Sequence, residues 1–418
     1  MKINRDEYLN QLIQKKHTPY IKIVTGVRRC GKSYLLKTLF CEHLRNEGVT
    51  DDQIVIVELD DDRFEELRSR KALREYVEQV APDEKTQYYI ILDEIQMVEA
   101  FEGTVISLNN HANYDVYITG SNSRFLSRDI STRFKDRGSE VRMHPLSYRE
   151  FFDAFGGDKH FALQEYLMFG GMPHLFDEPD DASKMRYLEN LIEQTYLSDV
   201  VERNTVRLPE EMGALFDVLC STTGSLVNPS GLAGTLQAEK HVKITDDTVY
   251  AYIQYLEDAF LFEKARRFDI KGKAYMKTPA KYYPEDVGLR NARINFRQND
   301  IGFGIENIVY NELRGRGYAV DVGMMECRER NEEGKQVYKQ REVDFVARMG
   351  SREYYIQVMD RTPDGRHREN EYDSLKKVPG SFRKIAVVNT PFKSFVNEDG
   401  ILIISLEEFL LDRNSLNL

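Results

Sequence analysis

Cysteine is scarce in this sequence, and the few cysteines are spread along the chain. No Cys-x-x-Cys pair occurs among the four, which are Cys30, Cys41, Cys220 and Cys327. This spacing argues against a zinc site and a disulfide framework, and it fits a reducing compartment. The sequence also lacks any apolar run near the roughly 20 residues that a membrane span needs. We therefore expect a cytoplasmic protein that makes no membrane contact.

Positively charged residues are also fewer than negatively charged ones. The 58 Lys and Arg residues are outnumbered by 69 Asp and Glu residues, which gives a net charge of −11. A field of that sign repels nucleic acid, so any DNA contact must come from a local basic patch. The 418 residues exceed what one core organises, and about three domains are expected.

Short β-rich runs alternate with helical patterns over residues 1–148. The runs are "YIKIVTG" (20–26), "IVIVEL" (54–59), "YYIILDE" (88–94), "VYITGS" (116–121) and "VRMHPLS" (141–147). Near-continuous Val, Ile and Tyr in short strands predicts a parallel sheet that is buried on both faces. Helical patterns fill 149–263, and a second α/β pattern begins near residue 300. The fold class is therefore α/β with a helical middle region.

A phosphate-binding motif follows the first run. "GVRRCGKS" (26–33) matches the Walker A or P-loop pattern G-x-x-x-x-G-K-[ST], between a predicted strand and a predicted helix. The glycines let backbone N–H groups turn inward, and the helix N-terminus adds positive potential. We expect Lys32 to reach the β- and γ-phosphates of ATP and the Ser33 hydroxyl to ligate Mg²⁺. The candidate contacts are Gly26, Val27, Arg28, Arg29, Cys30, Gly31, Lys32, Ser33 and Tyr34.

An acid pair ends the third run, as the Walker B element of such a site. Asp93 and Glu94 follow the apolar residues of "YYIILDE". Ligands of open α/β sheets bind at the carboxyl ends of strands, so the pair is expected beside the phosphates. Asp93 would hold Mg²⁺ through water, and Glu94 would orient and polarise the attacking water. Two surface acids are the alternative.

The fourth run ends in polar residues that could sense the γ-phosphate. In "VYITGSNSRFLS" the strand ends at Thr119, Gly120, Ser121 and Asn122. A polar side chain there can bridge the acid pair and the phosphate by a hydrogen bond. Ser121 and Asn122 are the candidates, and the sequence does not choose between them. An ordinary strand-to-helix cap is the alternative.

Three arginines precede the fifth run, and one of them could act as an arginine finger. They are Arg128, Arg133 and Arg137. A finger stabilises charge in phosphoryl transfer and can come from a neighbouring subunit, which would make the protein a homo-oligomer. Arg137, and after it Arg133, are the candidates. A plain surface arginine explains either one equally well.

Several motifs together resemble a family of bacterial and archaeal AAA+-related ATPases that carry a C-terminal domain of unassigned function. The motifs are "TGVRRCGKS", "LDEIQ", "ITGSNS", "HPLSYREF" and "FGGMP", and later matches such as "YLEDAFLFEKARRFD", "KYYPEDVGLRNA" and "EVDF" extend the resemblance over nearly the whole chain. The resemblance implies a winged-helix-like middle and a restriction-endonuclease-like end. The expected parts are an ATPase core (1–148), a helical lid or connector (149–208), a winged-helix-like domain with a basic wing (209–285) and a restriction-endonuclease-like α/β domain (286–418).

The middle region carries a pattern of three amphipathic helices typical of helix-turn-helix proteins. The third helix begins with acidic or neutral residues, which suit base reading poorly. The stretch that follows, 264–282, alternates basic and aromatic residues as a wing on phosphates would. The candidate DNA contacts are Arg266, Arg267, Lys271 and Lys273. A packing module that only connects two domains is the alternative.

The C-terminal region holds an incomplete nuclease pattern. A restriction-type core needs an acid on a helix, an Asp on one strand and Glu-x-Lys on the next, where the carboxylates hold Mg²⁺. Glu306 and Asp344 fill the first two positions. Gln357 and Met359 stand where the Glu and Lys belong, and methionine carries no positive charge. Lys376 or Lys377 is the candidate replacement, and we expect a degenerate site that binds without cleaving.

The sequence therefore predicts an ATP- and Mg²⁺-dependent ATPase that controls how its other two domains engage DNA. Two alternatives stay open. One is a nucleotide-switched signalling or scaffold ATPase with a protein partner, and the other is an active Mg²⁺-dependent DNA nuclease. The salt dependence of DNA binding separates the first from the DNA hypothesis, because phosphate contacts release counterions.

Overall fold

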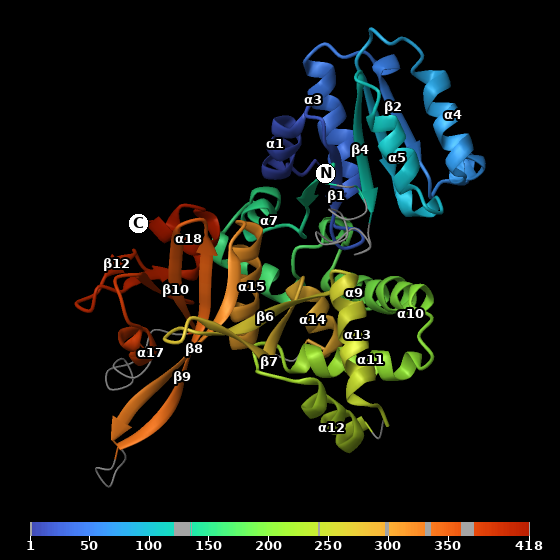
Figure 1. Cartoon of the computed structure of the whole chain (residues 1–418). Coiled ribbons are helices and arrows are strands. Elements are labelled where there is room, and N and C mark those ends of the chain that lie inside the picture. Colours follow the sequence, from blue (N-terminus) through green and yellow to red (C-terminus); the bar gives the residue numbers. More distant parts are fainter. Residues whose placement is uncertain are drawn as a thin grey trace. The chain divides into compact units, whose positions relative to one another are not determined.

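The computed structural model describes residues 2–120, 134, 136–240, 243–296, 301–330, 336–360 and 372–417. The chain forms two compact units (Figure 1). The first is Met1–Pro145 with Asp258–Phe260, and the second is Leu146–Glu257 with Leu261–Leu418. No helix among these described residues is long and apolar enough to cross a membrane.

The first unit is built on a five-stranded sheet in the order β2-β3-β4-β1-β5, in which every pairing is parallel. Its strands are β1 (Ile21–Thr25), β2 (Ile54–Glu58), β3 (Tyr88–Asp93), β4 (Tyr114–Gly120) and β5 (Gly138–Arg142). Every residue of β1, β3 and β4 is buried, as the continuous apolar runs predicted. The parallel α/β prediction for this region is confirmed.

The fifth strand differs from its predicted position. We expected it at 141–147, but only Val141 and Arg142 of that run lie in β5. The backbone of Met143 still donates to Thr25, and the chain then leaves the sheet before Pro145. Proline has no N–H with which to continue a strand ladder.

Helices cover both faces of the first sheet. They are α1 (Asp6–Lys15), α2 (Lys32–Tyr34), the π-helical η1 (Leu35–Phe40), α3 (Cys41–Asn46), η2 (Asp51–Gln53), η3 (Asp62–Arg68), α4 (Arg70–Val80), η4 (Ile95–Met97) and α5 (Glu102–Asn109). On one face Phe40 packs against Tyr117, with 4.7 Å between ring centroids. On the other face Val77 and Val105 join the core formed with Ile90. This two-sided burial fixes β1 and β3, whose carboxyl ends carry the predicted site.

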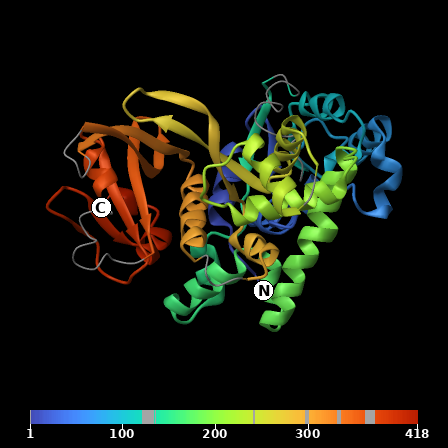
Figure 2. The same cartoon turned by 90° about the horizontal axis from the view of Figure 1, so that it is seen from below.

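The second unit contains an eight-stranded mixed sheet in the order β12-β13-β11-β10-β9-β8-β6-β7. Its strands are β6 (Phe262–Asp269), β7 (Ala274–Pro284), β8 (Ala319–Arg330), β9 (Gln336–Met349), β10 (Arg352–Met359), β11 (Arg383–Val388), β12 (Phe395–Val396) and β13 (Leu402–Ser405). The strands of the second α/β pattern, expected from about residue 300, correspond to β8 to β11. Figure 2 shows the β6–β7 hairpin, in yellow, beside the orange strands of this sheet.

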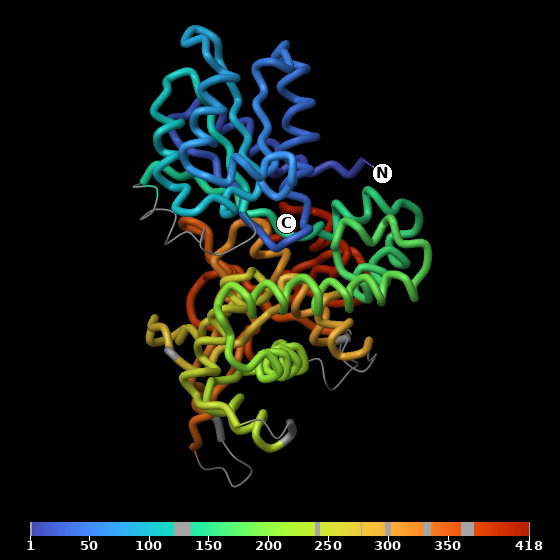
Figure 3. The backbone as a smooth tube through the Cα atoms, turned by 90° about the vertical axis from the view of Figure 1, so that its right-hand side faces the viewer, coloured from blue at the N-terminus to red at the C-terminus, as the bar shows by residue number. Residues whose placement is uncertain are grey.

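Helices make up the rest of the second unit. They are α7 (Tyr148–Phe155), α8 (Lys159–Phe169), η6 (Pro173–Asp177), α9 (Asp181–Asn190), η7 (Leu191–Leu197), α10 (Ser198–Arg203), α11 (Pro209–Ser221), α12 (Pro229–Lys240), α13 (Asp246–Asp258), α14 (Val287–Arg293), α15 (Ile301–Gly315), α17 (Asp373–Lys377), α18 (Leu406–Leu411) and η10 (Ser415–Asn417). Figure 3 traces α9, η7 and α10 as one continuous rod. The three helices expected before the basic stretch correspond to α11, α12 and α13.

The position of the β6–β7 hairpin corrects one expectation. We expected it to be the wing of a separate domain that ends at residue 285. Instead β6 pairs in parallel with β8, where Arg267 lies opposite Val322, and Ile270 donates its N–H to the Met324 carbonyl over 2.8 Å. Ile270 also packs in the core of the C-terminal strands. The expected boundary at 285/286 therefore cuts through one sheet.

The "FGGMP" and "PEDVGL" motifs pack against each other in the second unit. A Cβ on Gly288 would lie 1.8 Å from the Phe169 carbonyl oxygen, so only glycine fits there. The buried Asp286 caps α14 by accepting from the N–H groups of Gly288 and Leu289, and it also accepts from Gly171 over 2.7 Å. Burial raises the pKa of Asp286 to about 6, although these N–H groups favour the charged form. Both motifs therefore have a structural role.

Candidate nucleotide-binding site

The loop between β1 and α2 has the backbone conformation of a phosphate cradle. Gly26 has φ 141°, and a Cβ there would lie 2.0 Å from the Met143 carbonyl oxygen. Gly31 has φ 106° and stands at the N-terminus of α2. Residues with side chains adopt these conformations only at a cost, which explains both glycines of the motif. The loop thus presents backbone N–H groups at a helix N-terminus, where anions bind.

Lys32 folds over its own loop. Its side chain is buried, and Nζ donates to the carbonyl oxygens of Gly26, over 3.0 Å, and Val27, over 3.1 Å. Two neutral carbonyls do not neutralise a buried ammonium, so an arriving phosphate would gain a charge-assisted partner. Arg28 and Arg29 are exposed beside it.

Cys30 has a packing role in this loop. It is fully buried, and its Sγ lies 3.6 Å from the Met143 carbonyl oxygen. Its own carbonyl accepts from the guanidinium of Arg5 over 3.0 Å, and the same guanidinium donates to His144. Arg5 therefore ties the loop to the segment after β5. Sequence reasoning missed Arg5, because it lies 25 residues before Cys30 outside any motif. Tyr34, at the end of α2, is half-buried.

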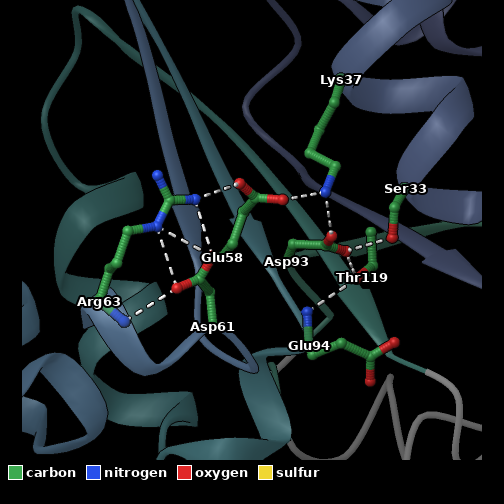
Figure 4. A network of polar contacts seen from close by, with 8 residues as sticks. All are labelled: Ser33, Lys37, Glu58, Asp61, Arg63, Asp93, Glu94 and Thr119. Carbon is green, nitrogen blue, oxygen red and sulfur yellow. Dashed lines mark hydrogen bonds and ion pairs between the residues drawn. The ribbon is translucent and has the colours of Figure 1, made fainter. Parts of the chain in front are cut away.

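The phosphate loop and the acid pair meet at Asp93 (Figure 4). The Ser33 hydroxyl donates to Asp93 Oδ1 over 3.0 Å, and the Thr119 hydroxyl donates to the same oxygen over 2.5 Å. Asp93 is 2% exposed. A hydroxyl and a carboxylate beside a phosphate loop are the oxygen ligands that Mg²⁺ prefers, with phosphates and waters completing its shell. Ser33 and Asp93 thus fit a magnesium ion.

Glu94 lies beside this pair but points elsewhere. Its φ of 51° is left-handed, and Figure 4 shows its carboxylate directed away from that of Asp93. The Glu94 N–H donates to Thr119 Oγ1 over 2.9 Å, and its carboxylate accepts from Gln96. Thr119 therefore bonds to both residues of the acid pair. The sequence predicted a phosphate-sensing polar residue at the end of this strand. The preferred candidates, Ser121 and Asn122, lie outside the described residues.

Of the arginine-finger candidates, the structure describes only Arg137. Arg128 and Arg133 fall outside the described residues. Arg137 is exposed, and its guanidinium donates to Asn110 over 2.8 Å. Its carbonyl accepts from the N–H of Ile21, at the start of β1, whereas the phosphate loop follows the end of β1. Arg137 therefore lies at the opposite edge of the sheet from the loop of its own chain.

Two further charged residues, Glu58 and Lys37, lie next to Asp93. Sequence reasoning did not select them. Glu58 and Asp93 are register partners at the ends of the neighbouring strands β2 and β3. Lys37, one helical turn after Ser33, lies 3.2 Å from Asp93 Oδ2 and also pairs with Glu58 (Figure 4). Both residues could have been selected from the sequence, because a Lys follows Ser33 by four residues and a Glu ends the run "IVIVE".

The nuclease-type residues gather in the second unit around a lysine that the sequence did not indicate. Lys281 of β7 is buried, and its Nζ lies 2.9 Å from Glu306 and 2.7 Å from Glu342. Asp344 accepts from Gln357 over 2.7 Å, and burial followed by the charge of Glu306 raises its pKa. Burial lowers the pKa of Lys281, but its acidic neighbours outweigh burial and raise it.

The replacement lysines expected on α17 do not join this cluster. Lys376 pairs with Asp399 over 2.9 Å, and Lys377 pairs with Asp373 on its own helix over 2.9 Å. That expectation is wrong because strand β7, rather than α17, places a lysine, Lys281, beside the carboxylates. Met359 is buried in the core. Among the described residues no group of three or more His, Cys, Asp or Glu is placed to hold a metal ion.

The four predicted DNA contacts differ in accessibility. Arg267 is buried and bonds weakly to Gln340 over 3.5 Å, so the expectation that it meets phosphates is wrong. Arg266 is exposed and lies over the Tyr275 ring at 4.3 Å. Lys271 and Lys273 are exposed near the hairpin turn, where Lys271 bonds to the Glu326 carbonyl. Alternation along β6 explains the difference between Arg266 and Arg267, because successive side chains face opposite sides of a sheet.

Comparisons with known proteins bear on this geometry. The model of an AAA domain family matches residues 18–152, and that of a domain of unknown function matches residues 160–300. Two solved structures align at low TM-scores. Cdc6p from Pyrobaculum aerophilum scores 0.31 with 12% identity over 71% of this chain and 95% of its own. The Aeropyrum pernix ORC1 protein in complex with DNA scores 0.29 with 12% identity over 71% and 93%. Scores this low carry no functional argument.

Two relatives match most of the chain. An uncharacterised protein of Haemophilus influenzae is 33% identical over 414 residues, which cover 98% of each chain. An uncharacterised protein of Methanocaldococcus jannaschii is 30% identical over 370 residues, which cover 85% of this chain and 77% of that protein. This chain therefore belongs to one family with these two relatives. The phosphate loop and the Ser33–Asp93 contact lie inside its matched AAA domain.

Proposed function

We propose that the protein is a Mg²⁺-dependent ATPase whose nucleotide state controls how its second unit engages DNA. The hydrogen bond from Ser33 to Asp93 carries the ATPase part of this proposal. It joins the phosphate loop to the end of β3, so one metal ion beside the loop would contact both motifs. Mg²⁺ would supply charge neutralisation on the phosphates when it is bound.

The protein's own residues have separate tasks in this proposal. Lys32 leaves its carbonyl partners and binds the terminal phosphates, and the loop N–H groups hold the others. Asp93 keeps the Ser33 hydroxyl oriented by accepting its hydrogen bond. Glu94 orients and polarises the attacking water once its carboxylate turns from Gln96 toward the phosphates. Thr119 donates to the Asp93 carboxylate and accepts from the Glu94 backbone N–H, and so holds the end of β3 against β4.

DNA engagement is proposed through the β6–β7 hairpin. Arg266, Lys271 and Lys273 are exposed there, and the hairpin follows the three helices α11 to α13 in the chain. This local positive charge is what a chain of net charge −11 needs to meet phosphates. The nuclease-like site is proposed to be non-cleaving, because the Lys281 ammonium already pairs with Glu306, one of the two acids that would hold a metal ion, and with the neighbouring Glu342.

One experiment tests the central proposal. Calorimetric titration of ATP into the purified protein, with and without Mg²⁺, should give saturable binding, and phosphate release should require Mg²⁺. The absence of binding heat under both conditions would refute the ATPase. Binding and turnover without DNA affinity at low salt would leave the nucleotide-switched scaffold with a protein partner. Mg²⁺-dependent nicking of DNA that is lost in Asp344→Ala would instead establish the nuclease.

A further inference from the structure

Two carboxylates face each other at the ends of β2 and β3. Glu58 and Asp93 are register partners on adjacent parallel strands, where like charges destabilise a sheet. Asp93 is buried and Glu58 is half-buried. Both stand at the carboxyl edge of the sheet, next to the loop that would hold ATP. This arrangement needs a cation, and the chain supplies one.

Lys37 is that cation. Its ammonium lies 3.2 Å from Asp93 Oδ2 and pairs with Glu58 Oε1, so it bridges the two strands (Figure 4). An ammonium in contact with two carboxylates is held in its charged form. It follows Ser33 by four residues, so both side chains leave the same face of the helix toward Asp93.

The two oxygens of Asp93 thus have different partners. Oδ1 accepts from the hydroxyls of Ser33 and Thr119, and Oδ2 pairs with Lys37. A magnesium ion approaching Ser33 and Asp93 meets a carboxylate that an ammonium already neutralises in part. The ammonium also repels the divalent ion through the partly desolvated site, where screening is weaker than in bulk water.

Glu58 gives Lys37 a second partner on the side away from Asp93. Arg63 adds to this side, because its guanidinium lies 3.8 Å from Glu58 and 2.7 Å from Asp61. The Arg63 side chain is 74% exposed, so the chain of charges runs from the surface to Asp93. Lys37 can therefore stay paired with Glu58 when Asp93 turns to a metal ion.

We propose that Lys37 is a positioning residue that competes with Mg²⁺ for Asp93 and so sets the magnesium concentration at which the site closes on ATP, with Glu58 receiving the ammonium when Mg²⁺ binds. This proposal rests on the proposed ATPase function. It explains why a lysine outside the phosphate motif lies on the acid that would hold the metal. It also predicts that Glu58 favours Mg²⁺ binding at Asp93, whereas Lys37 opposes it.

The test measures binding of a fluorescent ATP analogue across a series of free Mg²⁺ concentrations, with EDTA as the metal-free reference. Lys37→Met removes the charge and keeps the aliphatic stem, so the Mg²⁺ concentration for half-maximal binding should fall about tenfold. Glu58→Gln confines Lys37 to Asp93 and removes a negative charge, so the same concentration should rise severalfold. Lys37→Arg should stay close to the wild type because it keeps the charge.

Lys71→Met is the matched control, since Lys71 lies in the same unit on an exposed pair with Glu75 and should leave the Mg²⁺ dependence unchanged. A half-maximal concentration that rises or does not move in Lys37→Met, with ATP still bound, overturns the proposal. If thermal melting shows that Lys37→Met does not fold, the Glu58→Gln variant provides the test. A rise in its half-maximal Mg²⁺ concentration supports the proposal, and a fall or no change overturns it. A wild type that binds no nucleotide at any Mg²⁺ concentration removes the ATPase function and this inference together.

Discussion

The Ser33 hydroxyl donates a hydrogen bond to Asp93 Oδ1 over 3.0 Å, although the two residues are 60 positions apart in the chain. The contact exists because β1 and β3 flank β4 in one parallel sheet, so the segments after their carboxyl ends emerge at the same edge. It joins the phosphate loop to the acid pair through the protein's own side chains. Such pre-organisation lowers the cost of ordering the site on binding.

Lys32→Ala should weaken ATP binding about 100-fold or more, because each charge-assisted hydrogen bond to a phosphate contributes about 1.5–3 kcal/mol. Calorimetry measures the loss directly. The melting temperature should change little, since among the described residues Lys32 bonds to two carbonyls of its own loop. Lys71→Ala, at an exposed lysine of the same unit outside the loop, serves as the control and should bind nearly normally. Normal ATP affinity in Lys32→Ala would contradict the assigned phosphate contact.

Glu94→Gln should retain ATP and Mg²⁺ binding but lose turnover by about 10²–10⁴-fold, the range typical of a missing general base. The amide keeps the shape of the side chain and its reach to Gln96. Phosphate release under saturating ATP measures turnover, and calorimetry on the same sample confirms binding. Normal hydrolysis by Glu94→Gln would show that another residue orients the water.

Arg137→Ala should abolish any increase of specific turnover with protein concentration. Arg137 lies at the sheet edge opposite its own phosphate loop, so as a finger it would serve a neighbouring subunit. The wild-type rate per molecule is expected to rise with concentration as subunits associate. Wild-type rates independent of concentration would indicate that the chain acts alone. Asn110→Ala, which removes only the present partner of Arg137, is the control.

Replacing both Lys271 and Lys273 with Ala should weaken DNA binding at low salt and flatten its salt dependence. Each lost phosphate contact is expected to reduce the slope of log affinity against log salt by about one. Fluorescence anisotropy at several salt concentrations gives both values. The Lys376→Ala, Lys377→Ala double variant removes equal charge from α17 and should bind normally. Equal losses in both double variants would point to net charge rather than the hairpin.

Asp286→Asn should make stability less dependent on pH between about pH 4 and 6. The pKa of Asp286 is raised to about 6 in the folded state by burial, above its ordinary value of 3.8. The folded protein therefore binds the extra proton, and this contribution is complete below pH 3.8 and lost as pH rises through 6. The loss amounts to about 2–3 kcal/mol. Melting curves at stepped pH, compared between wild type and variant, should differ in slope across that window and nowhere above it.

The sequence by itself determined the local parts of this protein. The glycines at 26 and 31, the lysine and serine after them, and the apolar run ending in Asp93 each follow from short-range rules of backbone conformation and burial. The α/β class of the first unit and the strands of the second were predicted from the same kind of pattern. These features are readable because each depends on a few consecutive residues.

Only the tertiary structure decided which distant residues share a neighbourhood. Strand order placed Glu58 beside Asp93, and β7 brought Lys281 to Glu306. Pairing of β6 with β8 made one sheet of segments that the sequence divided at residue 285. Periodicity reports which face of a strand is buried, but not which strand lies next to it. That choice follows from how crossover connections and packed helices arrange the sheet, which no local pattern records.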